Sequence, residues 1–217
     1  MNRRARKCQK ESRLKSILYM HISSNIKEYI IVSILFIIGV IAGVIFINNM
    51  SDAQQLEIDD YITSFINYLK NSPTINDFAV LKDSVLKNIG IAMLLWFMGS
   101  TIIGISIVYL IVAFRGFVLG YTISSFILIL GIGKSLLIII PTLFLKNILI
   151  IPSIFCLAVS GIKLHNSIMK DRRKENIKTE ILTHSIFCLI VSLILIIASL
   201  IEVYMSNKIL IYFSAYL

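Results

Sequence analysis

The sequence has little charge for its length. Only 15% of its residues are Asp, Glu, Lys or Arg, whereas 57% are hydrophobic, a larger apolar share than a soluble domain carries. Long uncharged runs alternate with short polar segments, which excludes an ordinary water-soluble domain. The runs are continuous and do not alternate between polar and apolar residues, which excludes a β-barrel. We therefore predict an all-α fold, a polytopic integral membrane helical bundle.

Residues that could carry chemistry are also scarce. The chain has three histidines and three cysteines, with no H-E-x-x-H motif and no paired carboxylates in an apolar run. His165 and His184 stand alone at the ends of runs, where we expect interfacial side chains. Buried charged groups mark active and transport sites in membranes because they are costly there, and the five runs assigned below contain no Asp, Glu, Lys or Arg. We expect no catalytic residue, no cofactor and no metal site, and hence no enzyme.

The positive charge is concentrated in two segments. The formal net charge is +9, with eight basic residues in the first 28 positions and six between Lys163 and Lys178. Both segments flank apolar runs, where Lys and Arg mark the cytoplasmic side of a membrane. We therefore predict a basic cytoplasmic arm over 1–28 and a cytoplasmic loop over 163–180, and we expect lipid and no nucleic acid as the partner of these charges.

Five uncharged runs predict five transmembrane helices. They are residues 29–47, 89–113, 117–132, 148–162 and 181–201. The second and third are separated only by a short turn around Arg115, so we expect an antiparallel hairpin there. The segment 135–145, between Lys134 and Lys146, would span only about 16 Å as a helix, too little to cross a bilayer. We predict that it forms one short re-entrant or interfacial half-helix.

These spans make residues 29–217 one helical membrane domain. An even number of crossings separates the two basic segments, which keeps both on the cytoplasmic side. The amino terminus is then cytoplasmic and the carboxyl terminus extracytoplasmic, with an outer loop at 48–88 and an outer tail at 203–217. The protein is thus expected in a cell membrane as a multi-pass protein.

The outer loop 48–88 contains its own helical pattern. Ser51 and Gln54 have the spacing of a capping box, and Pro73 follows the far end of the pattern. Between them, large apolar residues recur at helical spacing and form one stripe. The stripe consists of Ile58, Tyr61, Ile62, Phe65, Ile66 and Leu69. It either packs on its own bundle or the membrane interface, or it docks another protein.

Glycines recur inside the apolar runs, where they allow close approach of helices. The candidate helix-packing residues are Gly39, Gly43, Gly99, Gly104, Gly116 and Gly120. The pairs Gly39/Gly43 and Gly116/Gly120 each have the small-x-x-x-small spacing. Packing within the chain and packing between copies in a homo-oligomer both remain open.

The stretch that follows Asn88 carries a family resemblance. After two spaced glycines and a short turn, the sequence reads Phe-Arg-Gly-Phe-Val-Leu-Gly-Tyr at 114–121, and Ile140-Pro141 and the run 147–152 follow. These motifs resemble those of the stage II sporulation protein M family. The wider family often has His-Gly after the first of these prolines and Glu before the second. Thr142-Leu143 and Ile150-Ile151 stand there instead, so a role tied to that His or Glu does not carry over.

The resemblance implies a function. The family it resembles is that of the membrane component of the forespore engulfment complex in endospore-forming bacteria. The resemblance implies that this component anchors two peptidoglycan-degrading partners at the septal membrane during endospore formation. We therefore expect a non-enzymatic scaffold for peptidoglycan hydrolases, with the apolar stripe of the outer loop as the candidate partner-binding surface. The alternative is a small membrane transporter or channel, with the half-helix 135–145 lining a path.

Overall fold

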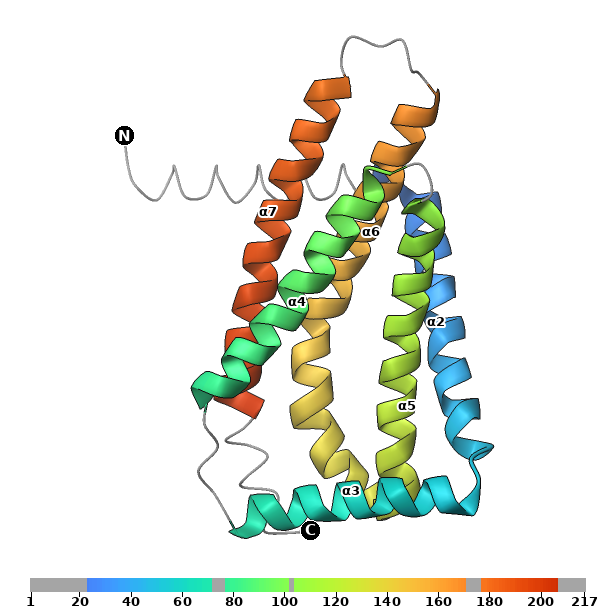
Figure 1. The fold of residues 1–217 in the computed structure, drawn as a ribbon, viewed down its shortest axis with the longest axis vertical. Coiled ribbons are helices and arrows are strands. Elements are labelled where there is room, and N and C mark those ends of the chain that lie inside the picture. Colours follow the sequence, from blue (N-terminus) through green and yellow to red (C-terminus); the bar gives the residue numbers. More distant parts are fainter. Residues whose placement is uncertain (1–22, 72–76, 102–103, 171–176, 207–217) are drawn as a thin grey trace.

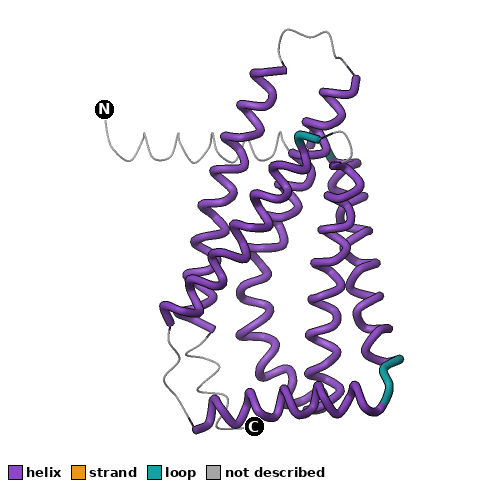
Figure 2. The backbone as a smooth tube through the Cα atoms, in the orientation of Figure 1, coloured by secondary structure: helices purple, strands orange, loops and turns teal. Residues whose placement is uncertain are grey.

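The chain is described from a computed structural model that covers residues 23–71, 77–101, 104–170 and 177–206. Within these ranges every regular element is helical (Figures 1 and 2), which confirms the predicted all-α class. The helices are α2 (Ile26–Asn48), α3 (Asp52–Asn71), α4 (Asp77–Gly99), α5 (Gly104–Ile139), α6 (Leu145–Lys170) and α7 (Ile177–Ile201), with short π-helical segments η1 (Ile140–Phe144) and η2 (Glu202–Ser206). Most of the basic arm, and the tail beyond residue 206, lie outside the described residues.

Five long helices form an upright bundle, and α3 lies across one end of it (Figure 1). We call this the α3 end of the bundle. Along the chain, α2, α5 and α7 run towards the α3 end, while α4 and α6 run away from it. Among the described residues, four segments are long and apolar enough to span a membrane, namely Ile26–Asn48, Gly104–Ile139, Thr142–Met169 and Lys178–Tyr204. The fifth bundle helix, α4, is more polar in its first half.

The predicted hairpin turn at Arg115 is wrong. α5 continues as helix through this residue, and the chain instead turns between Gly99 and Gly104, at the end opposite α3. The second bundle helix is therefore Asp77–Gly99 rather than 89–113, and the third is Gly104–Ile139 rather than 117–132. The first half of α4 remains helical despite its charges, helped by an ion pair one turn apart between Lys87 and Asp83, 2.6 Å.

The predicted half-helix 135–145 forms the connection between α5 and α6. α5 breaks at Gly131, whose φ of +73° favours glycine. Ser135 stabilises the break, because its hydroxyl oxygen lies 2.6 Å from the carbonyl oxygens of both Gly131 and Phe126 and its single hydrogen can be donated to either. The chain then passes through η1 into α6. This helical corner lies at the α3 end of the bundle.

The segments that were predicted as polar loops are largely helical. Half of the predicted capping box forms where α3 begins: the backbone N–H of Ser51 donates to the side-chain oxygen of Gln54 at 3.2 Å. The Ser51 hydroxyl donates to the same oxygen, also at 3.2 Å. At the other end, α6 runs on to Lys170 and α7 begins at Ile177. The cytoplasmic loop predicted for 163–180 therefore shrinks to a few residues.

The hydrophobic core lies between α4, α5, α6 and α7. Leu95, Val112, Leu157 and Ala198 are each fully buried there, one from each helix. α2 joins the core through Val32. Many other large apolar side chains of the bundle, among them Ile34, Leu110 and Leu193, are exposed, as expected for helices in contact with lipid.

Candidate functional site

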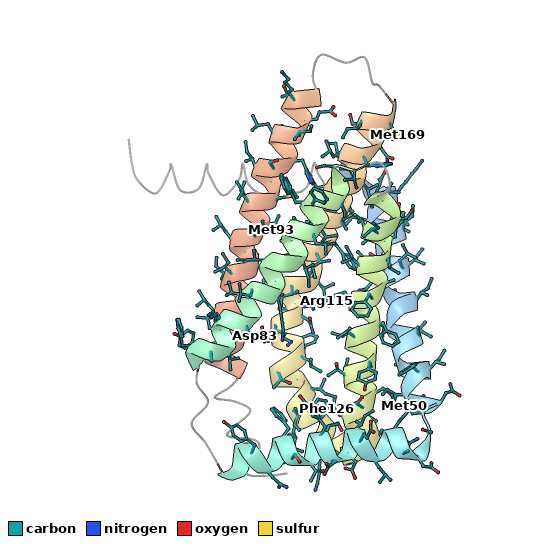
Figure 3. All side chains as sticks on the ribbon, viewed as in Figure 1. Met50, Asp83, Met93, Arg115, Phe126 and Met169 are labelled. Atoms are coloured by element: carbon teal, nitrogen blue, oxygen red, sulfur yellow. The ribbon has the colours of Figure 1, made fainter. Side chains whose placement is uncertain are left out.

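One face of α3 is fixed to the bundle. Ile62 and Ile66 are 4% and 7% exposed and form a small buried cluster with Ile138 of α5. Ile58 and Phe126 pack against this cluster at its margin, and Figure 3 shows Phe126 close to α3. Half of the predicted stripe therefore contacts the chain itself, at the corner that follows the break at Gly131.

A second face of α3 is open. Tyr61 is 76% exposed, Phe65 37% and Tyr68 55%. The three residues are spaced three and four apart, so they share one flank of the helix. We call these three residues the aromatic flank. The structure thus separates the six predicted partner-binding residues into buried Ile62 and Ile66, with Ile58 beside them, and exposed Tyr61 and Phe65; the side chain of Leu69 lies outside the described part.

The opposite flank of α3 is acidic. Leu56, Glu57, Asp59, Asp60 and Thr63 line a shallow hollow of about 480 Å³. The Thr63 hydroxyl donates to the Asp59 carboxylate at 3.2 Å. Within the described residues no group of three His, Cys, Asp or Glu side chains is arranged to hold a metal ion. Asp59 and Asp60, together with Thr63, form this anionic flank, whereas Glu57, four residues before Tyr61, lies beside the aromatic flank.

The predicted packing glycines form two close helix contacts within the chain. Gly39 and Gly43 of α2 face Gly116 and Gly120 of α5. A Cβ at Gly39 would lie 2.0 Å from the Ala113 carbonyl oxygen, and a Cβ at Gly116 would lie 2.2 Å from the Phe36 oxygen. The two small-x-x-x-small pairs thus bring the backbones of α2 and α5 into contact.

The second close contact joins α4 to α6. A Cβ at Gly99 would lie 2.6 Å from the Cα of Gly161. Gly104 is the first residue of α5, after the turn that follows α4, and a Cβ there would overlap the Met98 carbonyl oxygen. The sequence pattern did not identify Gly161, which has no second glycine four residues away.

A partly buried polar cluster lies towards the α3 end of the bundle, and the sequence interpretation missed it. Glu202 is its centre: the Lys146 Nζ lies 2.9 Å from one carboxylate oxygen, and the Ser84 hydroxyl donates to the other at 2.6 Å. One turn along α4, the Asn88 amide donates to the Ser199 hydroxyl at 2.9 Å. The cluster joins α4, the start of α6 and the end of α7.

Arg115 adds a second cation near this cluster. It lies on α5 at mid-height of the bundle, between the ribbons of α5 and α6 (Figure 3), and it interacts electrostatically with Glu202. Arg115, which was predicted to lie in a turn between two spans, therefore lies inside a membrane-spanning helix, and the prediction that the spans carry no charged residue is wrong there. The sequence did contain an indication of this position, because a single charge in a long apolar run marks either a turn or a functional position.

His184 is also buried, although an interfacial position was predicted. It is 4% exposed, and its Nδ1 lies 2.8 Å from the Ser160 hydroxyl on α6. A cavity of about 300 Å³ opens beside this pair, and Lys163, Glu180 and Thr183 are among its lining residues. The Nε2 of His184 lies 3.5 Å from the Cys188 sulfur. In a Ser-His-Asp triad the serine bonds Nε2 and a carboxylate bonds Nδ1, whereas here the serine bonds Nδ1 and Nε2 faces a sulfur.

His165 also bonds inside the fold. Its Nδ1 lies 3.0 Å from the Thr101 carbonyl oxygen, which ties α6 to the turn after α4. The other ring nitrogen remains for solvent or for a partner.

Comparison with known proteins identifies the family. The family model described as Stage II sporulation protein M matches residues 32–207, which include all of the described bundle from Val32 onwards. No curated protein and no solved structure is similar enough to the chain to match it.

Proposed function

The chain belongs to the stage II sporulation protein M family, and we propose that it is a non-enzymatic scaffold that anchors peptidoglycan-degrading proteins at the septal membrane during engulfment. The proposal combines two facts. The chain is a sporulation-related membrane protein with a helical bundle, and its α3 helix lies across one end of that bundle (Figure 1). A membrane anchor for hydrolases that cut the cell wall needs such a surface on the wall side.

The observation that carries the proposal is the division of α3 into two faces. Ile62 and Ile66 are buried and hold the helix on the bundle, whereas Tyr61, Phe65 and Tyr68 are exposed. Exposed aromatic side chains on a rigid support are common anchors of protein interfaces. In this proposal the aromatic flank contacts a hydrolase or its membrane-proximal segment.

The proposal includes the orientation of the bundle across the membrane. The basic residues of the arm and of the segment from Lys163 to Lys178 favour the cytoplasm for the end opposite α3. The α3 end then faces the cell wall. Labelling of single cysteines in intact cells with a membrane-impermeant maleimide should modify an Asp60→Cys variant and leave a Lys178→Cys variant unmodified; the reverse pattern would rule out the proposed docking.

Affinity capture tests the scaffold itself. The tagged protein is purified from sporulating cells in mild detergent, and the eluate is assayed for peptidoglycan hydrolysis in a gel. We expect hydrolase activity with the natural chain and with Thr63→Asp, which alters the acidic flank. We expect its loss with the Tyr61→Asp/Phe65→Asp double variant. Equal hydrolase recovery from both variants would reject the aromatic flank as the contact.

A second candidate function is a small transporter or channel. The observation that favours it is the polar cluster around Glu202, combined with the broken helix at Gly131, because transporters place such features at substrate paths. Transport is tested by measuring the flux of a defined solute into proteoliposomes that carry the natural chain and into proteoliposomes that carry the Glu202→Ala variant. Flux that depends on Glu202 would support transport in addition to anchoring.

A further inference from the structure

The cavity beside His184 lies between α6 and α7 in the half of the bundle away from α3. Its volume is about 300 Å³, and its lining includes the cation Lys163 on α6 and the anion Glu180 on α7. Leu164 and Phe187 give it an apolar wall. Ligand sites in proteins range over roughly 300–1,000 Å³, so this cavity has room for a small polar group with an apolar end.

Contacts on both sides of the cavity place it where the apolar bundle ends. On α6, the Nδ1 of His165 lies 3.0 Å from the carbonyl oxygen of Thr101, in the turn between α4 and α5. α6 and α7 continue beyond this turn (Figure 1). On α7, the Ser185 hydroxyl accepts a hydrogen bond of 3.0 Å from the indole of Trp96, and tryptophan is typical of the membrane–water interface. The cavity therefore lies at the depth of lipid headgroups.

The charged groups that line the cavity are available to a ligand. Among the described residues, neither Lys163 nor Glu180 forms a hydrogen bond or an ion pair, although both line the same cavity. Ser167 also lines it. Other serines in these helices, such as Ser153 and Ser192, donate to the carbonyl four residues earlier, whereas the Ser167 hydroxyl makes no such bond to the carbonyl of Lys163. The cavity thus presents one cation, one anion and one hydroxyl.

We propose that this cavity binds a headgroup that contains a phosphate and a primary ammonium, as in phosphatidylethanolamine. Lys163 attracts the phosphate as a point charge, and Ser167 donates to one of its oxygens. The Glu180 carboxylate accepts N–H bonds from the ammonium. Leu164 and Phe187 contact the glycerol and the first acyl carbons. Pockets between membrane helices at the headgroup level are established sites of such recognition.

The charges of the lining distinguish this ligand from other headgroups. A phosphatidylglycerol headgroup has no cation for Glu180, and its negative charge would lie close to that carboxylate. Phosphatidylcholine has a cation, but its ammonium carries no N–H to donate. The source of the ligand is either the membrane lipid or free phosphoethanolamine. The site is at the other end of the bundle from the aromatic flank and does not depend on the proposed scaffold function.

Lipid titration of the purified full-length protein tests the proposal. Phosphatidylethanolamine, phosphatidylglycerol and phosphatidylcholine with identical acyl chains are added separately in mixed micelles, and native mass spectrometry counts the bound lipid. We expect one molecule of phosphatidylethanolamine to bind several-fold more tightly than either of the others. Equal affinity for the three lipids, or preference for phosphatidylglycerol, would overturn the proposal.

Charge variants test the two contacts separately. Lys163→Gln should weaken phosphatidylethanolamine binding about 10-fold or more, because a charge-assisted contact is lost. Glu180→Gln should also weaken it, but should not weaken phosphatidylglycerol binding, because the repelled carboxylate charge is gone. Lys178→Gln is the matched control: it removes an exposed charge of α7 outside the cavity lining and should leave the affinity unchanged. Equal effects of Lys163→Gln and Lys178→Gln would reduce the binding to general attraction and overturn the site.

The source of the headgroup is tested with free phosphoethanolamine. It is titrated in detergent without added lipid, and the thermal unfolding midpoint is measured. A saturable rise that Lys163→Gln abolishes and Lys178→Gln retains would assign the site to the free solute. Binding of phosphatidylethanolamine with no response to phosphoethanolamine would assign it to the membrane lipid. If neither shows an effect that depends on Lys163, the cavity does not bind this headgroup.

Discussion

The contact between α2 and α5 gives the sharpest prediction about stability. A Cβ added at Gly39 would lie 2.0 Å from the Ala113 carbonyl oxygen, and at Gly43 it would lie 2.3 Å from the Phe117 oxygen. Real Cβ contacts essentially never fall below 3.0 Å, so Gly39→Ala requires a shift of about 1 Å between two backbones. Because the obstructing atoms are backbone atoms, no rotamer change can relieve the overlap.

The cost follows from that shift. A gap of 0.5–1 Å loses about a quarter to a half of the dispersion attraction between facing atoms, and overpacking a well-packed contact costs about 1–3 kcal/mol. We therefore expect Gly39→Ala to lower the free energy of unfolding by about 1–3 kcal/mol. The Gly39→Ala/Gly43→Ala double variant should cost less than the sum of the two, because one separation of the helices relieves both overlaps.

Gly90 and Gly133 provide matched controls. Both lie in helices, and a Cβ at either position would meet no atom within 4 Å. Gly→Ala there should be neutral or stabilise the protein by about 0.5–1 kcal/mol, because alanine restricts the unfolded chain. Reversible unfolding in mixed detergent micelles measures all four variants. If Gly39→Ala costs no more than Gly90→Ala, the reasoning about the helix contact is refuted.

Three further predictions concern single contacts. Ser160→Ala should destabilise the protein by about 1–3 kcal/mol, because it leaves a nitrogen of buried His184 unpaired. In thermal unfolding, the double variant Ser160→Ala/His184→Leu should recover much of this lost stability. A double variant no more stable than Ser160→Ala would contradict the prediction. Lys146→Met should cost about 1–3 kcal/mol because it leaves Glu202 without its cation, and Lys146→Met/Glu202→Leu should be more stable than Lys146→Met. Gln54→Ala should raise amide hydrogen exchange in the first turn of α3 without altering exchange in α5, because only the capping box is lost; unchanged exchange would show that the box does not stabilise α3.

The sequence was most informative where the helical spacing of apolar residues, or a short local motif, determines the secondary structure. The apolar stripe and the Ser51/Gln54 spacing correctly predicted a helix inside a polar loop, and that helix is α3. Both patterns involve residues that are close together in the sequence. The secondary structure that they predict therefore does not depend on how the rest of the chain packs.

The hairpin at Arg115 was mispredicted because a charged residue next to a glycine occurs both in turns and inside packed helices of membrane proteins. Arg115 followed by Gly116 is typical of a turn, yet both residues are also compatible with a helix in a packed bundle. Gly116 faces the backbone of α2 at Phe36, and Arg115 lies next to the core. Only the position of α2, far away in the sequence, decides between the two.

The polar cluster could not be predicted for a related reason. Ser84 and Glu202 are 118 residues apart in the chain, and Lys146 and Glu202 are 56 residues apart. Each residue lies near the end of an apolar run, where a single sequence predicts an interfacial side chain. A bond between such residues depends on which helices become neighbours, and that depends on the turn that was misplaced.

The most direct test of the scaffold function is a photo-crosslink from the aromatic flank. A photoreactive phenylalanine analogue replaces Tyr61, an exposed aromatic position that tolerates a ring of similar size, and Thr63 on the acidic flank serves as the control position. After irradiation of sporulating cells, we predict an adduct between the Tyr61 variant and a peptidoglycan hydrolase, and a weaker adduct or none from Thr63. Crosslinks from Tyr61 only to lipid, in cells where the hydrolases are present and active, would contradict the proposal that this surface anchors them.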